Sequence, residues 1–331
     1  MALGEFELIA RYFTRPTPRA VLGVGDDCAL LRCTPGMHMA VSSDMLVEGR
    51  HFFADVDPEA LGHKALAVNL SDLAACGARP TAFTLALALP EARAEWLEPF
   101  SKGLLALADA HGCELVGGDT TKGPLTISIT VMGEVPPGQA LLRSGARAGD
   151  DLYVSGNLGD ARLALGVFWK EWRVPPAVFD AARLRMERPT PRVALGLALR
   201  GVATAAADIS DGLLGDLGHI LRRSAVGATI DTEIAIKTLA AHASFTGAIG
   251  TFGTEFTQEQ ALQCVLNGGD DYELVFTAPP AQASAVLQAS ARSGVPVTRI
   301  GCIEAEAGVR LVDGQGAAVP LAYRSFDHFA A

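Results

Sequence analysis

The hydrophobic positions of this chain follow two different spacings, and they predict alternating strands and helices. In residues 126–134 the apolar residues Ile127, Ile129 and Val131 occupy every second position, which is typical of a strand. Asp57 and Pro58 form an N-cap and N1 pair, so we expect a helix from there to about Cys76, just before Gly77. The same reasoning predicts strands at 39–43 and 114–116 and a helix at 92–110.

The second half of the chain shows the same mixture of elements. We expect strands at 152–155, before Asp208, and at 228–230, 272–277, 297–303 and 309–312, with helices at 158–169, 191–200, 213–224, 258–266 and 281–294. Strands and helices that alternate in both halves predict an α/β fold. Short elements such as 309–312 favour mixed sheets over a purely parallel, doubly wound sheet.

The chain is long enough for two domains. It has 331 residues, and a typical domain has about 150. The composition changes at Pro136-Pro137-Gly138 and again across residues 145–151. We therefore predict an N-terminal domain at 1–138 and a C-terminal domain at 139–331.

Charge and cysteine content exclude several classes of protein. Lys and Arg number 27 against 37 Asp and Glu, a formal charge of −10, so no nucleic-acid partner is expected. The six cysteines are scattered without a C-x-x-C pair, which is typical of reduced thiols in a cytoplasmic protein. Glu5 and Glu7 interrupt any signal peptide, and the most apolar run, 81–90, is too short to cross a membrane.

The aspartates recur in loops of small residues at the ends of apolar segments. These loops are GVGDD, SSDM, NLSDL, GGDTT, DISDG and GGDDYE. Short carboxylates and flexible glycines suit Mg²⁺, which binds one or two carboxylates together with substrate phosphates. A single Gly-Asp pair is more often a turn, and His51 alone is more often a packed histidine. Asp72 differs because it falls inside an apolar helix, where we expect it to be buried against a cation.

Common phosphate and cofactor motifs are absent from the sequence. It contains no G-x-x-x-x-G-K-[ST] loop, no complete dinucleotide fingerprint, no G-x-S-x-G and no H-E-x-x-H. A phosphorylated ligand would therefore be bound through metal ions on carboxylates, with Arg143 and Lys122 among the few basic residues that could assist.

Taken in order, the motifs resemble the thiamine-monophosphate kinase family, within the superfamily of aminoimidazole ribonucleotide synthetase. The resemblance runs from GEFELIARYF through VGDDCALL, SSDMLVEGRHF, NLSDLAA, GGDTT, RSGARAGDD, RPTPR, DISDGL and GGDDYEL to FDHF, which is almost the whole chain. It implies a two-domain fold and ATP-dependent phosphorylation of thiamine monophosphate to thiamine diphosphate. It also implies a homodimer that pairs through the N-terminal sheets, with ATP between the N- and C-terminal domains.

The resemblance assigns roles residue by residue. Several Mg²⁺ ions would be bound by Asp27, Ser42, Ser43, Asp44, Asp72, Asp119, Asp208 and Asp211. ATP would contact Asp27, Gly118, Asp119, Arg143 and Ser210. The substrate would contact His51, Asp270 and Phe326. Two positions depart from the family: Asp270 replaces the usual Glu, and Phe326 replaces a larger or hydroxylated aromatic residue.

No general base is expected, because the acceptor is a phosphate oxygen that is already ionised. We expect direct in-line transfer, with Asp44, Asp72 and Asp119 at the β- and γ-phosphates and with Asp27, Asp208 and Asp211 near the acceptor. The rival hypotheses are another ATP-using enzyme of the superfamily, a non-catalytic nucleotide sensor and a purely structural dimerisation protein.

Overall fold

The protein consists of two compact units. The computed structural model describes residues 4–240 and 256–320. The first unit comprises residues 1–73 and 78–140, and the second comprises 74–77 and 141–331. Each unit contains one sheet with its own helices.

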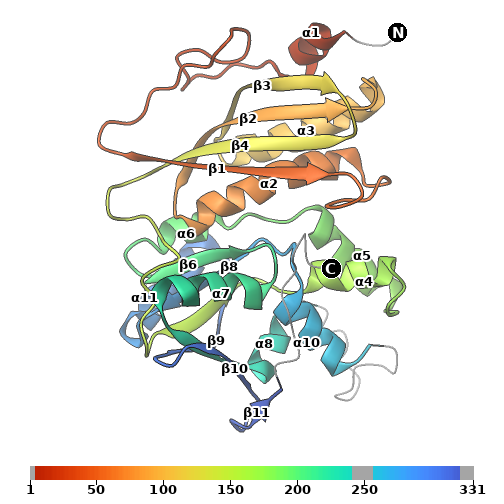
Figure 1. The fold of residues 1–331 in the computed structure, drawn as a ribbon. Helices are drawn as coiled ribbons and strands as arrows, with labels where there is room; N and C mark the ends of the chain where they lie inside the picture. The colour runs from red at the N-terminus through yellow and green to blue at the C-terminus, as the bar shows by residue number, and fades with distance from the viewer. Residues whose placement is uncertain (1–3, 241–255, 321–331) are drawn as a thin grey trace. The chain divides into compact units, whose positions relative to one another are not determined.

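The first unit is built on a four-stranded sheet in the order β1-β4-β2-β3 (Figure 1). Its elements are α1 (Glu5–Leu8), the π-helical turn η1 (Ile9–Phe13), β1 (His38–Val47), α2 (Pro58–Ala75), β2 (Arg79–Leu89), α3 (Ala94–Ala110), β3 (Glu114–Lys122) and β4 (Thr126–Val135). Strands β2 and β3 are parallel, and the other two pairings are antiparallel. Strands β1 and β3 are therefore the edges of the sheet.

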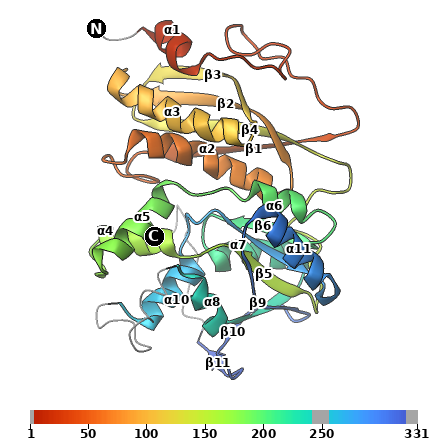
Figure 2. The ribbon, with the colours of Figure 1, turned by 180° about the vertical axis from the view of Figure 1, so that it is seen from behind.

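The two faces of this sheet differ. Helices α2 and α3 cover one face, as Figure 2 shows from behind, and there Phe83 and Ile129 are fully buried. In the part of the chain that the structure describes, no helix covers the opposite face. On that face β1 exposes Met39, Val41 and Met45, of which Val41 is 61% exposed. An uncovered face that exposes large apolar side chains is typical of an interface.

The second unit is built on a seven-stranded mixed sheet in the order β11-β10-β7-β9-β5-β8-β6. Its elements are β5 (Asp151–Ser155), α4 (Asp160–Phe168), α5 (Pro176–Glu187), α6 (Val193–Ala198), β6 (Ala205–Ile209), α7 (Leu213–Ser224), β7 (Gly227–Asp231), α8 (Thr232–Ala235), η2 (Ile236–Thr238), α10 (Gln258–Asn267), β8 (Glu273–Ala278), η3 (Pro280–Gln282), α11 (Ala283–Ser293), β9 (Val297–Glu304), β10 (Gly308–Val312) and β11 (Ala318–Val319). Among the described strands of this sheet, β7 and β10 form the single parallel pair.

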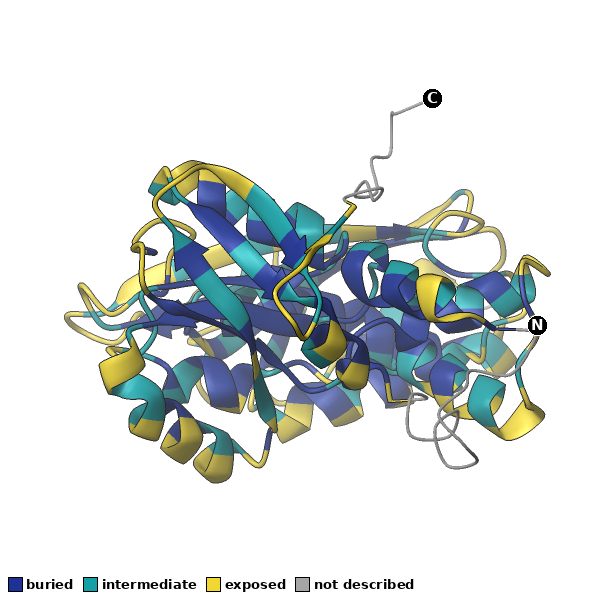
Figure 3. Ribbon diagram, turned by 90° about the horizontal axis from the view of Figure 1, so that it is seen from below, coloured by how far each residue is buried: buried dark blue, intermediate teal, exposed yellow. Residues whose placement is uncertain are grey.

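Helices lie on both faces of the second sheet. Helix α7 packs on β6 and β8, whereas α11 packs with α6 and β9, and Figures 1 and 2 show α7 and α11 on opposite sides. Strands β5, β8 and β6 are adjacent in this sheet and are buried along their whole length. In Figure 3 the exposed colour accordingly falls mainly on loops and on the outer faces of helices.

The two mixed sheets confirm the predicted α/β class. Most predicted elements are present within a few residues, although β1 and β3 extend further than expected, to Val47 and Lys122. Strand β2 and helix α5 were not predicted. Strand β2 contains the apolar run 81–90, and α5 has a weakly amphipathic sequence. Among the described residues, no helix is both long and apolar enough to span a membrane.

Candidate active site

In the first unit, β1 and α2 bring three of the predicted residues together. The Ser42 hydroxyl donates a hydrogen bond to a carboxylate oxygen of Asp72. The Asn69 side-chain oxygen accepts the Asp44 N–H at 3.0 Å, and its amide nitrogen donates to the Ala65 carbonyl at 3.0 Å. Asn69 thus ties the strand to the helix at Asp44. The group offers hydroxyl and carboxylate oxygens, the ligand type that Mg²⁺ prefers.

The prediction that Asp72 is buried is wrong, because its side chain is partly exposed. It lies where α2 faces the edge strand β1, next to Ser42, so solvent still reaches it. Its neighbours Ser71 and Leu73 are fully buried. A partly exposed carboxylate needs no buried cation to be stable and can accept one from solution.

Ser43 lies on the opposite face of β1 from Ser42 and Asp44, because successive side chains of a strand alternate. Its hydroxyl donates to the Ile129 carbonyl at 3.1 Å and contacts the Thr130 hydroxyl at 3.1 Å. The structure therefore does not bring the Ser43 hydroxyl to the group of Ser42, Asp44 and Asp72.

Asp27 and His51 lie in loops of the same unit. Asp27 is exposed, and its N–H donates to the Asp26 carboxylate at 2.8 Å. His51 follows β1, and its Nδ1 accepts the Val47 N–H at 2.9 Å. A neutral His51 with Nδ1 as acceptor carries its proton on Nε2, so Nε2 is the nitrogen that can donate to a ligand.

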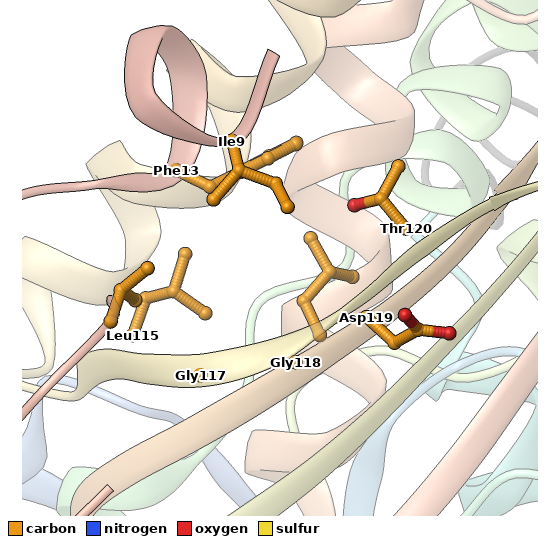
Figure 4. A pocket seen from close by; sticks show the side chains of 9 residues that line it. Ile9, Phe13, Leu115, Gly117, Gly118, Asp119 and Thr120 are labelled. Atoms are coloured by element: carbon orange, nitrogen blue, oxygen red, sulfur yellow. The ribbon is translucent and has the colours of Figure 1, made fainter. Parts of the chain in front are cut away.

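Gly118 and Asp119 lie on β3, beside a small apolar cavity of about 50 Å³. Figure 4 shows Ile9 and Phe13 of η1 over this cavity, with the Asp119 carboxylate turned away from them. Gly118 has φ +149°, and a Cβ there would collide with the Leu85 carbonyl. Only glycine fits this position, because it lacks a side chain and adopts positive φ.

The strand register separates Asp119 from Asp44. Asp44 pairs with Ile129 of β4, Ile129 with Leu85 of β2, and Leu85 with Gly118 of β3. Three strand spacings of about 4.8 Å place the backbones of Asp44 and Gly118 about 14 Å apart. Asp119 also points to the opposite face from Asp44. Within one chain, these two carboxylates cannot bind the same ion.

In the second unit, the predicted residue Asp208 lies near the end of β6, and Ser210 and Asp211 lie in the loop that follows this strand. Asp216 of α7 organises this loop, because one of its oxygens accepts the N–H groups of Ser210 and Asp211, each at 3.0 Å. Burial raises the pKa of Asp216 to about 7 against the lowering effect of those two bonds and of the nearby Arg143 guanidinium. Asp216 was not predicted, although the spacing in DISDGLLGD places it in the first turn of the following helix.

Asp270 is joined directly to the same loop. Its N–H donates to the Ser210 carbonyl at 2.8 Å, and the Tyr272 N–H donates to the Ile209 carbonyl at 2.9 Å. The structure thus brings Asp208, Ser210, Asp211 and Asp270 together. Phe326 lies outside the described residues.

No ready-made metal cage is present among residues 4–240 and 256–320. No three His, Cys, Asp or Glu side chains there are close enough to hold a metal ion.

Comparisons with known proteins identify the class of protein to which this chain belongs. The chain matches the AIR synthase related protein N-terminal domain over residues 25–135 and the corresponding C-terminal domain over residues 147–314. It is 45% identical to the thiamine-monophosphate kinase of Salmonella typhimurium over 336 aligned residues, which cover 100% of this chain and 99% of that protein.

Solved structures agree with this relationship. The crystal structure of thiamine-monophosphate kinase from Stenotrophomonas maltophilia K279a has a TM-score of 0.81 and 45% identity, covering 96% of this chain and 99% of that one. A second relative, AaThiL in complex with AMPPCP and TMP, has a TM-score of 0.73 and 31% identity, covering 90% and 89%. The chain belongs to the thiamine-monophosphate kinase family. This confirms the resemblance that the motifs indicated.

Proposed function

We propose that this chain transfers the γ-phosphoryl group of ATP to thiamine monophosphate, giving thiamine diphosphate and ADP. The observation that carries the proposal is the 45% identity to a thiamine-monophosphate kinase over the whole of both chains. A relative that binds AMPPCP and TMP on the same fold supports both substrates. The six free cysteines are in keeping with the reducing cytoplasm, where we place the reaction.

Several Mg²⁺ ions take part, and this chain supplies their oxygen ligands. In the first unit these are Asp27, Ser42, Ser43, Asp44, Asp72 and Asp119. In the second unit they are Asp208 and Asp211. Since the Ser43 hydroxyl faces away from Asp44, Ser43 would contribute through its main-chain oxygen. When bound, the ions neutralise the phosphates and the charge that develops on the transferred group.

The nucleotide binds beside Gly118 and Asp119. Arg143 and Ser210 of the second unit contact the phosphates. Arg143 is exposed and already lies within electrostatic reach of Asp216.

The acceptor contacts His51, Asp270 and Phe326. Asp270 presents a carboxylate that accepts hydrogen bonds from the amino group of the thiamine pyrimidine ring. No side chain is needed as a general base, because the acceptor phosphate is ionised near neutral pH. Transfer is in line and direct, so positioning and electrostatics supply most of the rate enhancement. A chirally labelled γ-phosphorus would be inverted, and retention would contradict a single displacement.

The active enzyme is a homodimer that pairs through the uncovered face and edges of the first sheet. Met39, Val41 and Met45 are exposed there, and β1 and β3 have no neighbouring strand on their outer sides. Pairing gives hydrogen-bond partners to the backbone groups at these edges and buries the apolar side chains. It also gives Asp44 access to Asp119 of a second copy, which the distance within one chain forbids. The N-terminal domain, 1–138, thus dimerises and binds metal and ATP, and residues 139–331 complete the nucleotide and substrate contacts.

The test is a chromatographic assay of the purified chain with ATP, Mg²⁺ and thiamine monophosphate, with and without EDTA. Equal amounts of thiamine diphosphate and ADP, formed only without EDTA, are expected. ATP turnover without thiamine diphosphate would assign another acceptor and favour a sister enzyme. Mg²⁺-dependent ATP binding without turnover would instead indicate a sensor.

A further inference from the structure

The segment from Asp270 to Tyr272, which leads into Glu273 at the start of β8, has an unusual backbone. Asp270 has φ +69° and Tyr272 has φ +53°. Residues with a side chain rarely adopt this left-handed conformation, and it persists only where the surroundings impose it. Such residues concentrate at functional sites, and Asp270 is a proposed substrate contact.

Alternate residues from Asp270 to Glu273 form hydrogen bonds to two different parts of the chain. The N–H groups of Asp270 and Tyr272 bind the loop after β6, as described above. The carboxylates of Asp271 and Glu273 instead bind the end of β5 and the loop that follows it. Asp271 Oδ2 accepts the Gly159 N–H at 2.8 Å, and Glu273 accepts the Ser155 hydroxyl at 2.6 Å.

The loop 156–159 is shaped around these carboxylates. Gly156 and Gly159 have φ +52° and +85°, and a Cβ on Gly156 would collide with the Glu273 carboxylate. Both carboxylates are almost completely buried, with Glu273 0% and Asp271 5% exposed. The loop and the segment therefore fit each other closely.

The two carboxylates differ in how well they are compensated. Glu273 forms ion pairs with Arg185 at 3.0 Å and with Arg192. Asp271 accepts one hydrogen bond, from the Gly159 N–H, and its Oδ1 is buried without a hydrogen-bond partner. Burial raises the pKa of Asp271 well above its usual value, although the nearby Arg185 guanidinium lowers it. A buried carboxyl with a single hydrogen bond is unfavourable for stability, which points to a role beyond holding the fold.

We propose that Asp271 is a positioning residue for the acceptor substrate: its bond to the Gly159 N–H holds its neighbours Asp270 and Tyr272 in the left-handed conformation that aims the Asp270 carboxylate at the thiamine moiety. This inference rests on the proposed function. Asp216 holds Ser210 and Asp211 separately, through two hydrogen bonds of its own. Loss of the Asp271 bond therefore affects the acceptor and leaves the nucleotide loop in place.

The test compares Asp271→Ala with Asp271→Asn. The alanine variant should raise the KM for thiamine monophosphate roughly 10- to 100-fold, the scale of a misplaced binding group, with the KM for ATP changed less than about threefold. The asparagine variant keeps an oxygen for the Gly159 N–H and should restore the KM. In an Asp270→Ala background, Asp271→Ala should add nothing, because it acts through Asp270.

Asp150→Ala is the matched control. Asp150 is also buried, and it accepts the Arg147 N–H at 3.0 Å and the Thr204 hydroxyl at 2.6 Å, but it lies before β5, whereas loop 156–159 follows that strand. It should lower thermal stability without a selective rise in the KM for thiamine monophosphate. If Asp271→Ala does not fold, Asp271→Val replaces it. An apolar side chain of similar size fills the buried position but cannot accept the Gly159 N–H, so this variant should raise the same KM.

Three results would overturn the inference. These are an unchanged KM for thiamine monophosphate in the folded variant, an equal rise in the KM for ATP, or effects of Asp270→Ala and Asp271→Ala that add. A wild-type chain that forms no thiamine diphosphate in the same assay would instead refute the proposed function, and the inference with it.

Discussion

If Asp44 and Asp119 bind one metal ion, they must come from two copies of the chain. The strand register places them about 14 Å apart and on opposite faces of the same sheet. Mg²⁺ requires its oxygens at 2.0–2.1 Å. Each active site of the homodimer would then contain Asp44 of one copy and Asp119 of the other. Asp44→Asn and Asp119→Asn should each reduce activity roughly 10²- to 10³-fold when present in both copies.

Mixing the two inactive variants should restore activity. Random exchange of copies makes half of all dimers mixed, and each mixed dimer carries both substitutions in one site and none in the other. About a quarter of wild-type activity is therefore expected, from the symmetry of a two-fold dimer. The assay is thiamine diphosphate formation after co-expression of differently tagged variants, with the mixed dimer isolated by tandem affinity steps. The isolated mixed dimer should reach about half of wild-type activity.

The control for this experiment is a mixture of Asp44→Asn with Asp72→Asn. The Ser42 hydroxyl on β1 binds the Asp72 carboxylate within one chain. Asp44 and Asp72 of the same copy therefore contribute to the same active site. Every site of that mixed dimer carries one substitution, and no recovery is expected. Recovery in the control, or none in the test pair, would refute the assignment of Asp119 to a second copy.

Three further outcomes follow from single contacts. Asp72→Asn should reduce turnover roughly 10²- to 10³-fold at saturating Mg²⁺ with an unchanged circular dichroism melt, and near-normal turnover would make Asp72 merely structural. Gly118→Ala should cost about 1–3 kcal/mol in chemical denaturation, because φ +149° and the adjacent carbonyl of β2 exclude a side chain; an unchanged midpoint would contradict this. Burial alone would raise the pKa of Glu134, but hydrogen bonds from Thr34 and Arg79 outweigh it and lower the pKa. The ionised Glu134 therefore stabilises the fold at pH values above its unfolded pKa, and this stabilisation is lost as the pH falls through its folded pKa. The loss of unfolding free energy in Glu134→Gln should be largest above about pH 5. In acid, the stability of the variant should approach that of the wild type.

Strands and helices were predicted best where the apolar residues follow a single regular spacing. The alternation Ile127, Ile129, Val131 identified β4, and the predicted helix 213–224 matches α7. Strand β2 was missed because alanines lie between its buried leucines, so that the alternation of buried and less buried positions is hidden in a continuous apolar run. Helix α5 was missed because its apolar and polar residues are poorly segregated.

The sequence offers the candidate site residues as a list but not their arrangement. The motif order predicts the carboxylates, and the structure groups Asp44 with Asp72 and joins Asp270 to the Ser210 loop. Whether two carboxylates meet depends on strand order, which no local motif contains, and this is why Asp119 had been grouped with Asp44. Asp216 and Asp271 were missed as supporting residues because their roles depend on hydrogen bonds to backbone groups.

The central claim is that one phosphoryl group moves from ATP to thiamine monophosphate. Phosphorus NMR of a single reaction, run with wild type and with Asp72→Asn, tests it most directly. For wild type, we predict that the thiamine monophosphate signal is replaced by the paired signals of thiamine diphosphate as ATP becomes ADP in equal amount, with the variant nearly silent. Release of inorganic phosphate, with thiamine monophosphate unchanged, would contradict the account.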